Sequence, residues 1–112
     1  MKKVLIIDDE VDLCVMIKQF LTRKKYDVQI AHTLKDGFMF LNTEVPDALI
    51  LDNNLPDGMG WDAVESIHEK YPHMKITLMS AYRLPKDFRS GLDKSIVILE
   101  KPVSLLEIEQ FL

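Results

Sequence analysis

The sequence lacks three features that would each assign it to a large class of proteins: paired cysteines, a long hydrophobic run and a block of basic residues. The lone Cys14 cannot form an internal disulfide and fits a small core residue, which favours a cytoplasmic protein. A membrane-spanning helix needs about 20 apolar residues in succession. The apolar run after Lys3 has only four before acids follow, so neither a membrane span nor a signal peptide is expected. The net charge of -4 argues against direct binding to nucleic acid or anionic lipid.

The 112 residues, 47% of them hydrophobic and 29% charged, have the length and composition of one globular domain. Short apolar runs predict strands at 3–8, 28–31, 48–52, 76–80 and 96–99. Between them, apolar residues at spacings of three and four predict helices around 13–21, 34–41, 61–67 and, less regularly, 85–92. A last helix begins at Ser104, with Glu107 completing a capping-box pattern, and is cut short at Leu112. We therefore expect a single α/β domain over residues 1–112, a doubly wound parallel sheet of five strands with helices on both faces.

Carboxylates stand at the ends of two predicted strands, where a buried run should end on an apolar residue. Asp8 and Asp9 close the first strand, and Asp52 closes the third. In an open parallel sheet, ligands bind beyond the carboxyl ends of the strands, near the point where the strand order reverses. A strand order of 2-1-3-4-5 would bring these acids to one edge with Ser80, which ends the fourth strand, and Lys101, which follows the fifth. Each acid alone could be a turn or helix-cap residue, so the prediction of a site depends on the whole group.

A group of three carboxylates, a hydroxyl and an ammonium favours phosphoryl chemistry. Clustered carboxylates repel one another, and a hard divalent cation removes that repulsion. Mg²⁺ fits because it prefers oxygen ligands and takes part of its coordination shell from phosphate oxygens. Asp52 would then be an anion that needs no general base and could attack phosphorus to form an aspartyl phosphate. Lys101 and Ser80 would hold the phosphoryl oxygens.

These residues make the chain similar to the receiver domains of bacterial two-component response regulators, which have a flavodoxin-like fold. The resemblance spans nearly the whole chain and rests on IIDDE, LDNNLPDGMG, the MSA after the fourth strand and the EKP after the fifth. It implies that Asp52 accepts a phosphoryl group. It also implies that Asp9, Asp52 and the backbone carbonyl of Asn54 ligate Mg²⁺ directly, and that Asp8 does so mostly through water.

The resemblance further implies a switch and a set of partners. Ser80 would move toward the phosphate, and Lys101, before a cis peptide bond to Pro102, would pair with it. A sensor histidine kinase or a histidine phosphotransfer protein would supply the phosphoryl group in the cytoplasm. The signal would pass to an output protein or to a C-terminal effector domain absent from this chain, and a phosphorylation-dependent homodimer also fits. The chain departs from the family at Ile98, where most members carry Tyr or Phe.

The sequence favours a signalling module, not an enzyme that acts on external substrates. Three other functions fit it less well. A phosphohydrolase with an aspartate nucleophile would need a second acid two residues later, where this chain has Asn54. An unphosphorylated receiver-like interaction module would be expected to have lost part of the acidic, hydroxyl and ammonium set, and the set is complete. A nucleotide or flavin site is disfavoured because the first strand leads into acids and not into a glycine-rich turn.

Overall fold

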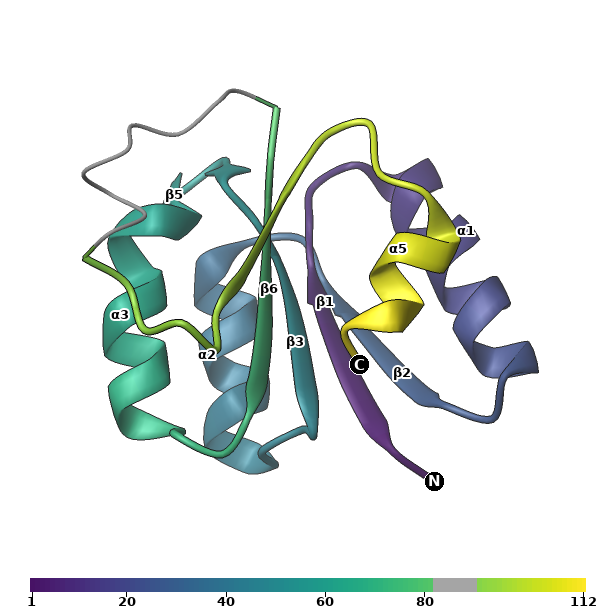
Figure 1. Cartoon of the computed structure of the whole chain (residues 1–112), viewed down its shortest axis with the longest axis horizontal. Helices are drawn as coiled ribbons and strands as arrows, with labels where there is room; N and C mark the ends of the chain where they lie inside the picture. Colours follow the sequence, from purple (N-terminus) through teal and green to yellow (C-terminus); the bar gives the residue numbers. More distant parts are fainter. Residues whose placement is uncertain (82–90) are drawn as a thin grey trace.

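Five parallel strands form one sheet in the computed structural model, which describes residues 1–81 and 91–112. The strands are β1 (Lys3–Ile7), β2 (Asp27–Ala31), β3 (Ala48–Asp52), β6 (Lys75–Ser80) and β7 (Val97–Glu100). Their order in the sheet is β2-β1-β3-β6-β7 (Figure 1). This is the predicted order 2-1-3-4-5 when these strands are counted along the chain, and each predicted strand lies within one residue of its observed bounds.

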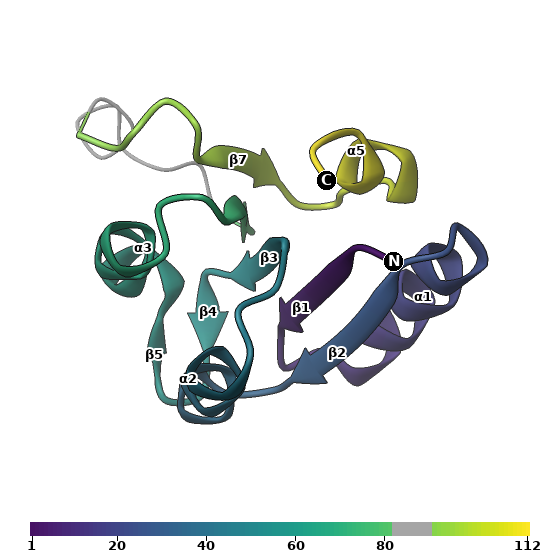
Figure 2. The same ribbon diagram turned by 90° about the horizontal axis from the view of Figure 1, so that it is seen from below.

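Helices cover both faces of the sheet, as Figures 1 and 2 show. One face carries α1 (Val11–Arg23) and α5 (Leu105–Gln110), and the other carries α2 (Leu34–Thr43) and α3 (Gly60–Lys70). The short helix predicted over 85–92 falls mostly on residues 82–90, outside the described residues, and Gly91 and Leu92 are not helical. No helix in the described ranges is both long and apolar enough to cross a membrane.

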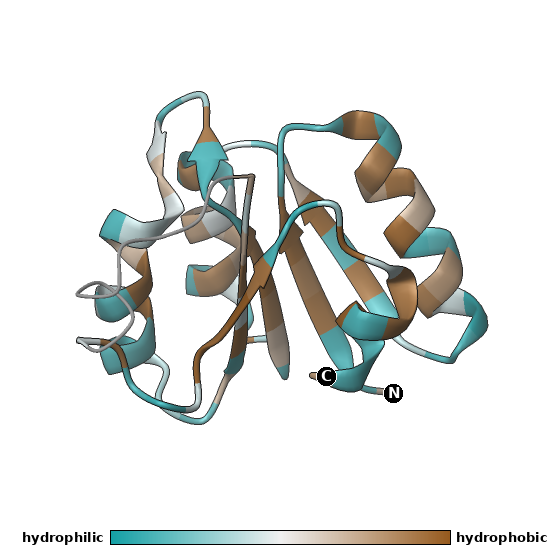
Figure 3. Cartoon of the chain, turned by 45° about the horizontal axis from the view of Figure 1, so that its top comes forward, coloured by the Kyte–Doolittle hydropathy of each residue, from teal (hydrophilic) through white to brown (hydrophobic). Residues whose placement is uncertain are grey.

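The unbroken apolar runs form strands because both faces of the central strands are buried. Along β1, Val4 and Ile6 pack toward α1 and α5, whereas Leu5 and Ile7 pack toward α2 and α3. Figure 3 shows the hydrophobic colour concentrated on the strands of the sheet. Cys14 is fully buried in the α1 face, as predicted.

Met16 and Phe38 belong to the apolar residues at helical spacing that predicted helices around 13–21 and 34–41, but they do not lie on buried faces. Met16 is 53% exposed and Phe38 is 39% exposed. On α2 the inward positions are Leu34, Gly37 and Leu41. The helix lies so close to β1 that a Cβ atom at Gly37 would stand 2.3 Å from Cδ1 of Ile7, so Gly37 faces the sheet and the neighbouring Phe38 is partly exposed.

A small hairpin follows β3, where the sequence indicated only a turn. Strand β4 (Asn54–Leu55) pairs antiparallel with β5 (Gly58–Met59), and α3 begins at the next residue. Gly60 permits this close entry, because a Cβ atom there would lie 2.5 Å from the carbonyl oxygen of Asp52. The hairpin therefore lies directly against the end of β3.

The last helix begins with the predicted capping box. The Ser104 hydroxyl accepts a hydrogen bond from the Glu107 amide at 3.1 Å, and the Glu107 carboxylate accepts one from the Ser104 amide at 3.2 Å. Just before it, the Lys101–Pro102 peptide bond is cis, as the resemblance implied. Lys101 thus stands between the end of β7 and the first turn of α5.

Candidate functional site

The carboxyl ends of the strands bring the predicted acids together at one edge of the sheet. Asp8 follows β1 and Asp52 ends β3, and these two strands pair in parallel with Ile7 beside Leu51. One carboxylate oxygen from each of Asp8, Asp9 and Asp52 lies within 4.8 Å of the other two. Asp8 and Asp52 are buried and Asp9 is exposed, so the acidic cluster opens to solvent on the Asp9 side.

Lys101 reaches this cluster from the carboxyl end of β7, the outermost strand on that side of the sheet. Its Nζ atom lies 3.2 Å from Oδ1 of Asp52 and 3.3 Å from Oδ2 of Asp8. Its backbone amide donates a hydrogen bond of 2.7 Å to the carbonyl oxygen of Ser80, which joins the residue after β7 to the last residue of β6. Among the described residues, Lys101 is the cation paired with these carboxylates, and its one positive charge is smaller than the summed negative charge of the three acids when all are ionised.

Burial and charge shift the pKa values of these groups. Burial raises the pKa of Asp52 to about 6, with the Asp8 charge adding to the shift and the Lys101 charge opposing it. Burial likewise raises the pKa of Asp8, against the hydrogen bond from the Glu10 amide and the charge of Lys101. For Lys101, burial by itself lowers the pKa, but the charges of Asp8 and Asp52 outweigh it and leave the pKa raised. Lys101 therefore stays protonated, and ionised Asp52 carries an electrostatic cost.

The backbone around Asp8 is held by three elements. Its amide continues the β1–β2 ladder by donating to the carbonyl of Ala31 at 3.0 Å. Its own carbonyl accepts a hydrogen bond from Sγ of Cys14 at 3.3 Å and lies 2.8 Å from Nδ1 of His32. One carboxylate oxygen accepts from the Glu10 amide at 2.9 Å, which leaves the other facing Lys101. Burial raises the pKa of the Cys14 thiol to about 12, which disfavours the thiolate form that a reactive cysteine needs.

Ser80 and Asn54 lie beside the acidic cluster. Ser80 is buried at the carboxyl end of β6, paired with Glu100 of β7. Asn54 begins β4 two residues after Asp52 and is half-buried. The structure therefore places every residue of the predicted site at the same sheet edge.

Three residues near the site have roles that the sequence did not indicate. Glu10, the N-cap residue of α1, places Oε1 at 3.5 Å from Nζ of Lys101. Asn53 accepts a hydrogen bond from the Trp61 amide at 2.9 Å and thereby caps α3, whose N-cap residue Met59 offers no side-chain cap. Asp57 accepts hydrogen bonds from the first two amides of α2. The polar Asn53 directly after a buried strand could have been recognised from the sequence as a capping residue. No local pattern in the sequence indicates that Asp57 contacts Leu34.

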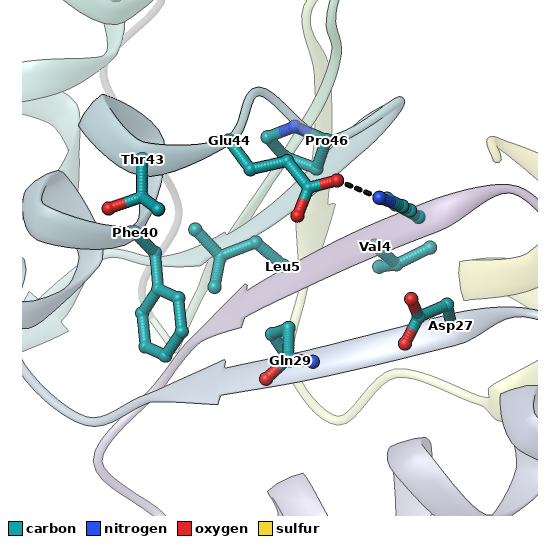
Figure 4. A pocket seen from close by; sticks show the side chains of 9 residues that line it. Val4, Leu5, Asp27, Gln29, Phe40, Thr43, Glu44 and Pro46 are labelled. Atoms are coloured by element: carbon teal, nitrogen blue, oxygen red, sulfur yellow. Dashed lines mark ion pairs between the residues drawn. The ribbon is translucent and has the colours of Figure 1, made fainter.

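A separate hollow of about 240 Å³ lies at the opposite end of the sheet (Figure 4). Its lining includes Lys3 and Asp27, which begin β1 and β2, and the Phe40 ring of α2. Lys3 forms an ion pair with Glu44 across it. None of the clustered acids lines this hollow, so it is not part of the site.

The sequence profile of the response regulator receiver domain matches residues 4–112. The chain belongs to this family. This receiver is 32% identical over 105 residues to the response regulator protein PilR of Pseudomonas aeruginosa, an alignment that covers 93% of this chain and 24% of PilR. It is 29% identical over 107 residues to the transcriptional regulatory protein TrcR of Mycobacterium tuberculosis, covering 95% of this chain and 42% of TrcR. The chain spans less than half the length of these relatives.

Solved receiver structures share the fold of this receiver. A CheY-like receiver domain protein from Methanospirillum hungatei has a TM-score of 0.87 and 28% identity, over 98% of this chain and 89% of that one. The response regulator protein TrrA of Thermotoga maritima, solved in complex with Mg²⁺ and BeF, has a TM-score of 0.75 and 25% identity over the whole of both chains. The five-stranded order is thus that of a receiver domain.

Proposed function

We propose that this receiver accepts a phosphoryl group on Asp52, with Mg²⁺ as the required cofactor. The observation that carries the proposal is the position of Asp52, a buried carboxylate held 3.2 Å from the Lys101 ammonium within a cluster of three acids. Response-regulator receivers interact with kinases and effector domains, so the donor would be a sensor histidine kinase or a histidine phosphotransfer protein. Which kinase it is would be decided by surfaces outside the site.

The acidic cluster fits Mg²⁺ by the chemistry of its donors. Its carboxylate oxygens are hard ligands lying within 4.8 Å of one another, and one ammonium cannot neutralise them all. We assign Asp9, Asp52 and the Asn54 carbonyl as direct ligands and Asp8 as a ligand mostly through water. Bound Mg²⁺ would neutralise the acids and orient the oxygens of the incoming phosphoryl group. The complex of the similar TrrA with Mg²⁺ and BeF supports the choice of Mg²⁺ as the cation.

The residues of the chain divide the work of phosphoryl transfer. A carboxylate oxygen of Asp52 forms a bond to phosphorus while the bond from phosphorus to the donor histidine nitrogen breaks. The donor nitrogen leaves with the electron pair of the broken bond and takes up a proton, so the carboxylate charge of Asp52 is lost and the phosphoryl oxygens bring their own negative charge to the site. Lys101, which pairs with Asp52 before transfer, would pair with one of these oxygens, and the Ser80 hydroxyl would hold another. Ser80 at the end of β6 and Lys101 after β7 would therefore move toward the bound phosphoryl group.

The product of this chemistry stays attached to the protein, so we infer a signalling function in the cytoplasm without turnover of external substrates. Asn54 supports this inference, since it stands where a phosphohydrolase with an aspartate nucleophile would need a second acid. The receiver would act through residues 1–112 on an output protein, on an effector domain joined to it, or on a second copy of itself. The regulatory proteins PilR and TrcR are longer than this chain, which supports the option of an effector domain joined to the receiver.

Intact-mass spectrometry tests the proposal. The chain is incubated with Mg²⁺ and acetyl phosphate, and the addition of one phosphoryl group is expected. Asp52→Asn keeps the shape of the side chain, removes the nucleophile and should take up no label, and EDTA should prevent labelling of the parent. An acyl phosphate should be released by hydroxylamine. An unchanged mass with donor and metal present, or full labelling of Asp52→Asn, would refute the proposal.

A further inference from the structure

The segment between β3 and α3 is fastened at its base by Asn53. The Asn53 amide donates to the carbonyl of Met79 at 2.8 Å, which holds the segment to β6. The Asn53 carbonyl accepts from the Gly60 amide at 2.7 Å and its side chain accepts from the Trp61 amide at 2.9 Å. The base of the hairpin is thus fixed between the sheet and the first turn of α3.

The tip of the same hairpin is fastened by Asp57. Asp57 lies in the turn between the paired residues Leu55 and Gly58. Its two carboxylate oxygens accept hydrogen bonds from the amides of Leu34 and Lys35, at 2.8 and 2.9 Å. Gly58 packs against the same turn of α2: its φ angle is 157° and a Cβ atom there would stand 2.9 Å from Cδ1 of Leu34. The hairpin tip therefore rests on the start of α2.

Helix α2 has a cap of its own beside these bonds. Thr33 is its N-cap residue, and the Thr33 hydroxyl accepts from the Asp36 amide at 3.1 Å. Asp57 satisfies two further amides that have no partner within the helix. The bonds of Asp57 differ from that of Thr33 in what they join, since only Asp57 connects α2 to the hairpin. The Asp57 bonds are therefore also a tether on the hairpin.

We propose that Asp57 is a positioning residue for the metal site, because its tether to α2 fixes the hairpin whose first residue is Asn54. This inference rests on the proposed function, which assigns the Asn54 carbonyl to Mg²⁺. The hydrogen bonds of Asp57 hold the tip of the hairpin in addition to its base. Without them, only the packing of Leu55 and Gly58 holds the tip, so the hairpin would shift more easily about its base and move Asn54. Mg²⁺ is sensitive to such movement because it demands near-ideal octahedral geometry.

Calorimetric titration of the metal-free chain with Mg²⁺ alone tests the inference. Asp57→Ala removes the tether, and loss of groups that orient ligands typically weakens metal binding by about tenfold or more, so we expect about a tenfold higher Kd. Asp57→Ser keeps one acceptor and should restore part of the affinity. Thr33→Ala is the matched control, because it removes a cap from the same helix terminus without touching the hairpin, and its Kd for Mg²⁺ should equal that of the parent.

Hydrogen exchange of the metal-free variants gives a second readout that does not depend on metal. Asp57→Ala should speed exchange in residues 53–60 and in the first turn of α2, whereas Thr33→Ala should speed it in α2 alone. A parent-like Kd in Asp57→Ala, or an equal loss in Thr33→Ala, would overturn the inference, and so would unchanged exchange in residues 53–60. A parent chain that binds no Mg²⁺ would instead refute the proposed function, which separates the two failures.

Discussion

Asp52 and Asp57 lie on the same short segment, five residues apart, in opposite environments. Asp52 is 3% exposed at the end of β3, and burial raises its pKa to about 6. Asp57 is exposed at the hairpin tip, and the hydrogen bonds from the Lys35 and Leu34 amides hold its pKa below the ordinary value. Within one short segment, a buried carboxylate whose ionised form carries an electrostatic cost is followed by an exposed carboxylate whose hydrogen bonds join the hairpin to α2. The first is the carboxylate for which we propose metal binding and phosphorylation, whereas the second has a structural role.

The largest expected effect is on stability without metal. Asp52→Asn removes a buried charge that faces Asp8, so it should raise the free energy of unfolding at neutral pH in EDTA by on the order of 2 kcal/mol. Glu10→Gln is the control, because Glu10 also faces Lys101 at 3.5 Å but its side chain is 60% exposed, and exposed pairs contribute little. Urea unfolding measures both. Equal effects of the two substitutions would contradict the contrast between buried and exposed acids.

The next largest expected effect is a contribution of Asp52 to the pH dependence of stability. Because its pKa is raised on folding, Asp52 favours the folded chain fully below pH 3.8, and this contribution is lost as the pH rises through about 6. Asp8, also raised, acts in the same direction. Other carboxylates titrate in this range, so the quantity to measure is the difference between parent and Asp52→Asn from acid to neutral pH in EDTA. This difference should grow with pH, and saturating Mg²⁺ should reduce it. A difference independent of pH would be inconsistent with a raised pKa.

Asp57 should show the opposite slope with a smaller effect. Its lowered pKa means that its contribution to stability is present above pH 3.8 and is lost as the pH falls through the folded-state pKa. Asp57→Ser should therefore melt at a lower temperature than the parent at neutral pH, and the two melting temperatures should converge in acid. Added salt should also narrow the gap, because the charge is exposed. A gap that persists in strong acid would mean that the carboxylate charge does not matter.

The two regions also differ in how far the sequence could predict them. Strand ends that carry acids are informative because buried parallel strands have a clear apolar signature and their carboxyl ends must meet at one edge. The proximity of Asp8, Asp52 and Lys101 follows from that rule. The hairpin could not be predicted in this way, because strands of two residues are too short to show an alternating pattern. The sequence NNLPDG also has the composition of an ordinary turn.

Contacts between distant elements account for the remaining errors. Asp57 meets Leu34 only because the sheet order brings the end of β3 near the start of α2, and no spacing rule spans those 23 positions. Helix α2 approaches Ile7 most closely at Gly37, a residue that the apolar pattern does not count, and the neighbouring Phe38 is 39% exposed. Sequence periodicity identified the elements, whereas their closest approaches decided which side chains were buried.

The smallest expected effect is a change in hydrogen exchange at the residues through which a signal would leave the site. The Lys101 amide bonds to the Ser80 carbonyl at 2.7 Å, so a pull on either residue moves the ends of β6 and β7 together. Ile98 is half-buried on β7 beside Leu78 and contacts the core on the α2 and α3 face. We expect Ile98 to repack when Ser80 and Lys101 approach a phosphoryl group, so that an aromatic residue is not needed at this position.

Hydrogen exchange with and without Mg²⁺ and beryllium fluoride should then show changes in residues 91–112, which Ser80→Ala should weaken. Changes limited to the 54–59 hairpin, or a Ser80→Ala response equal to that of the parent, would place the signal on the Asp57 side of the site instead.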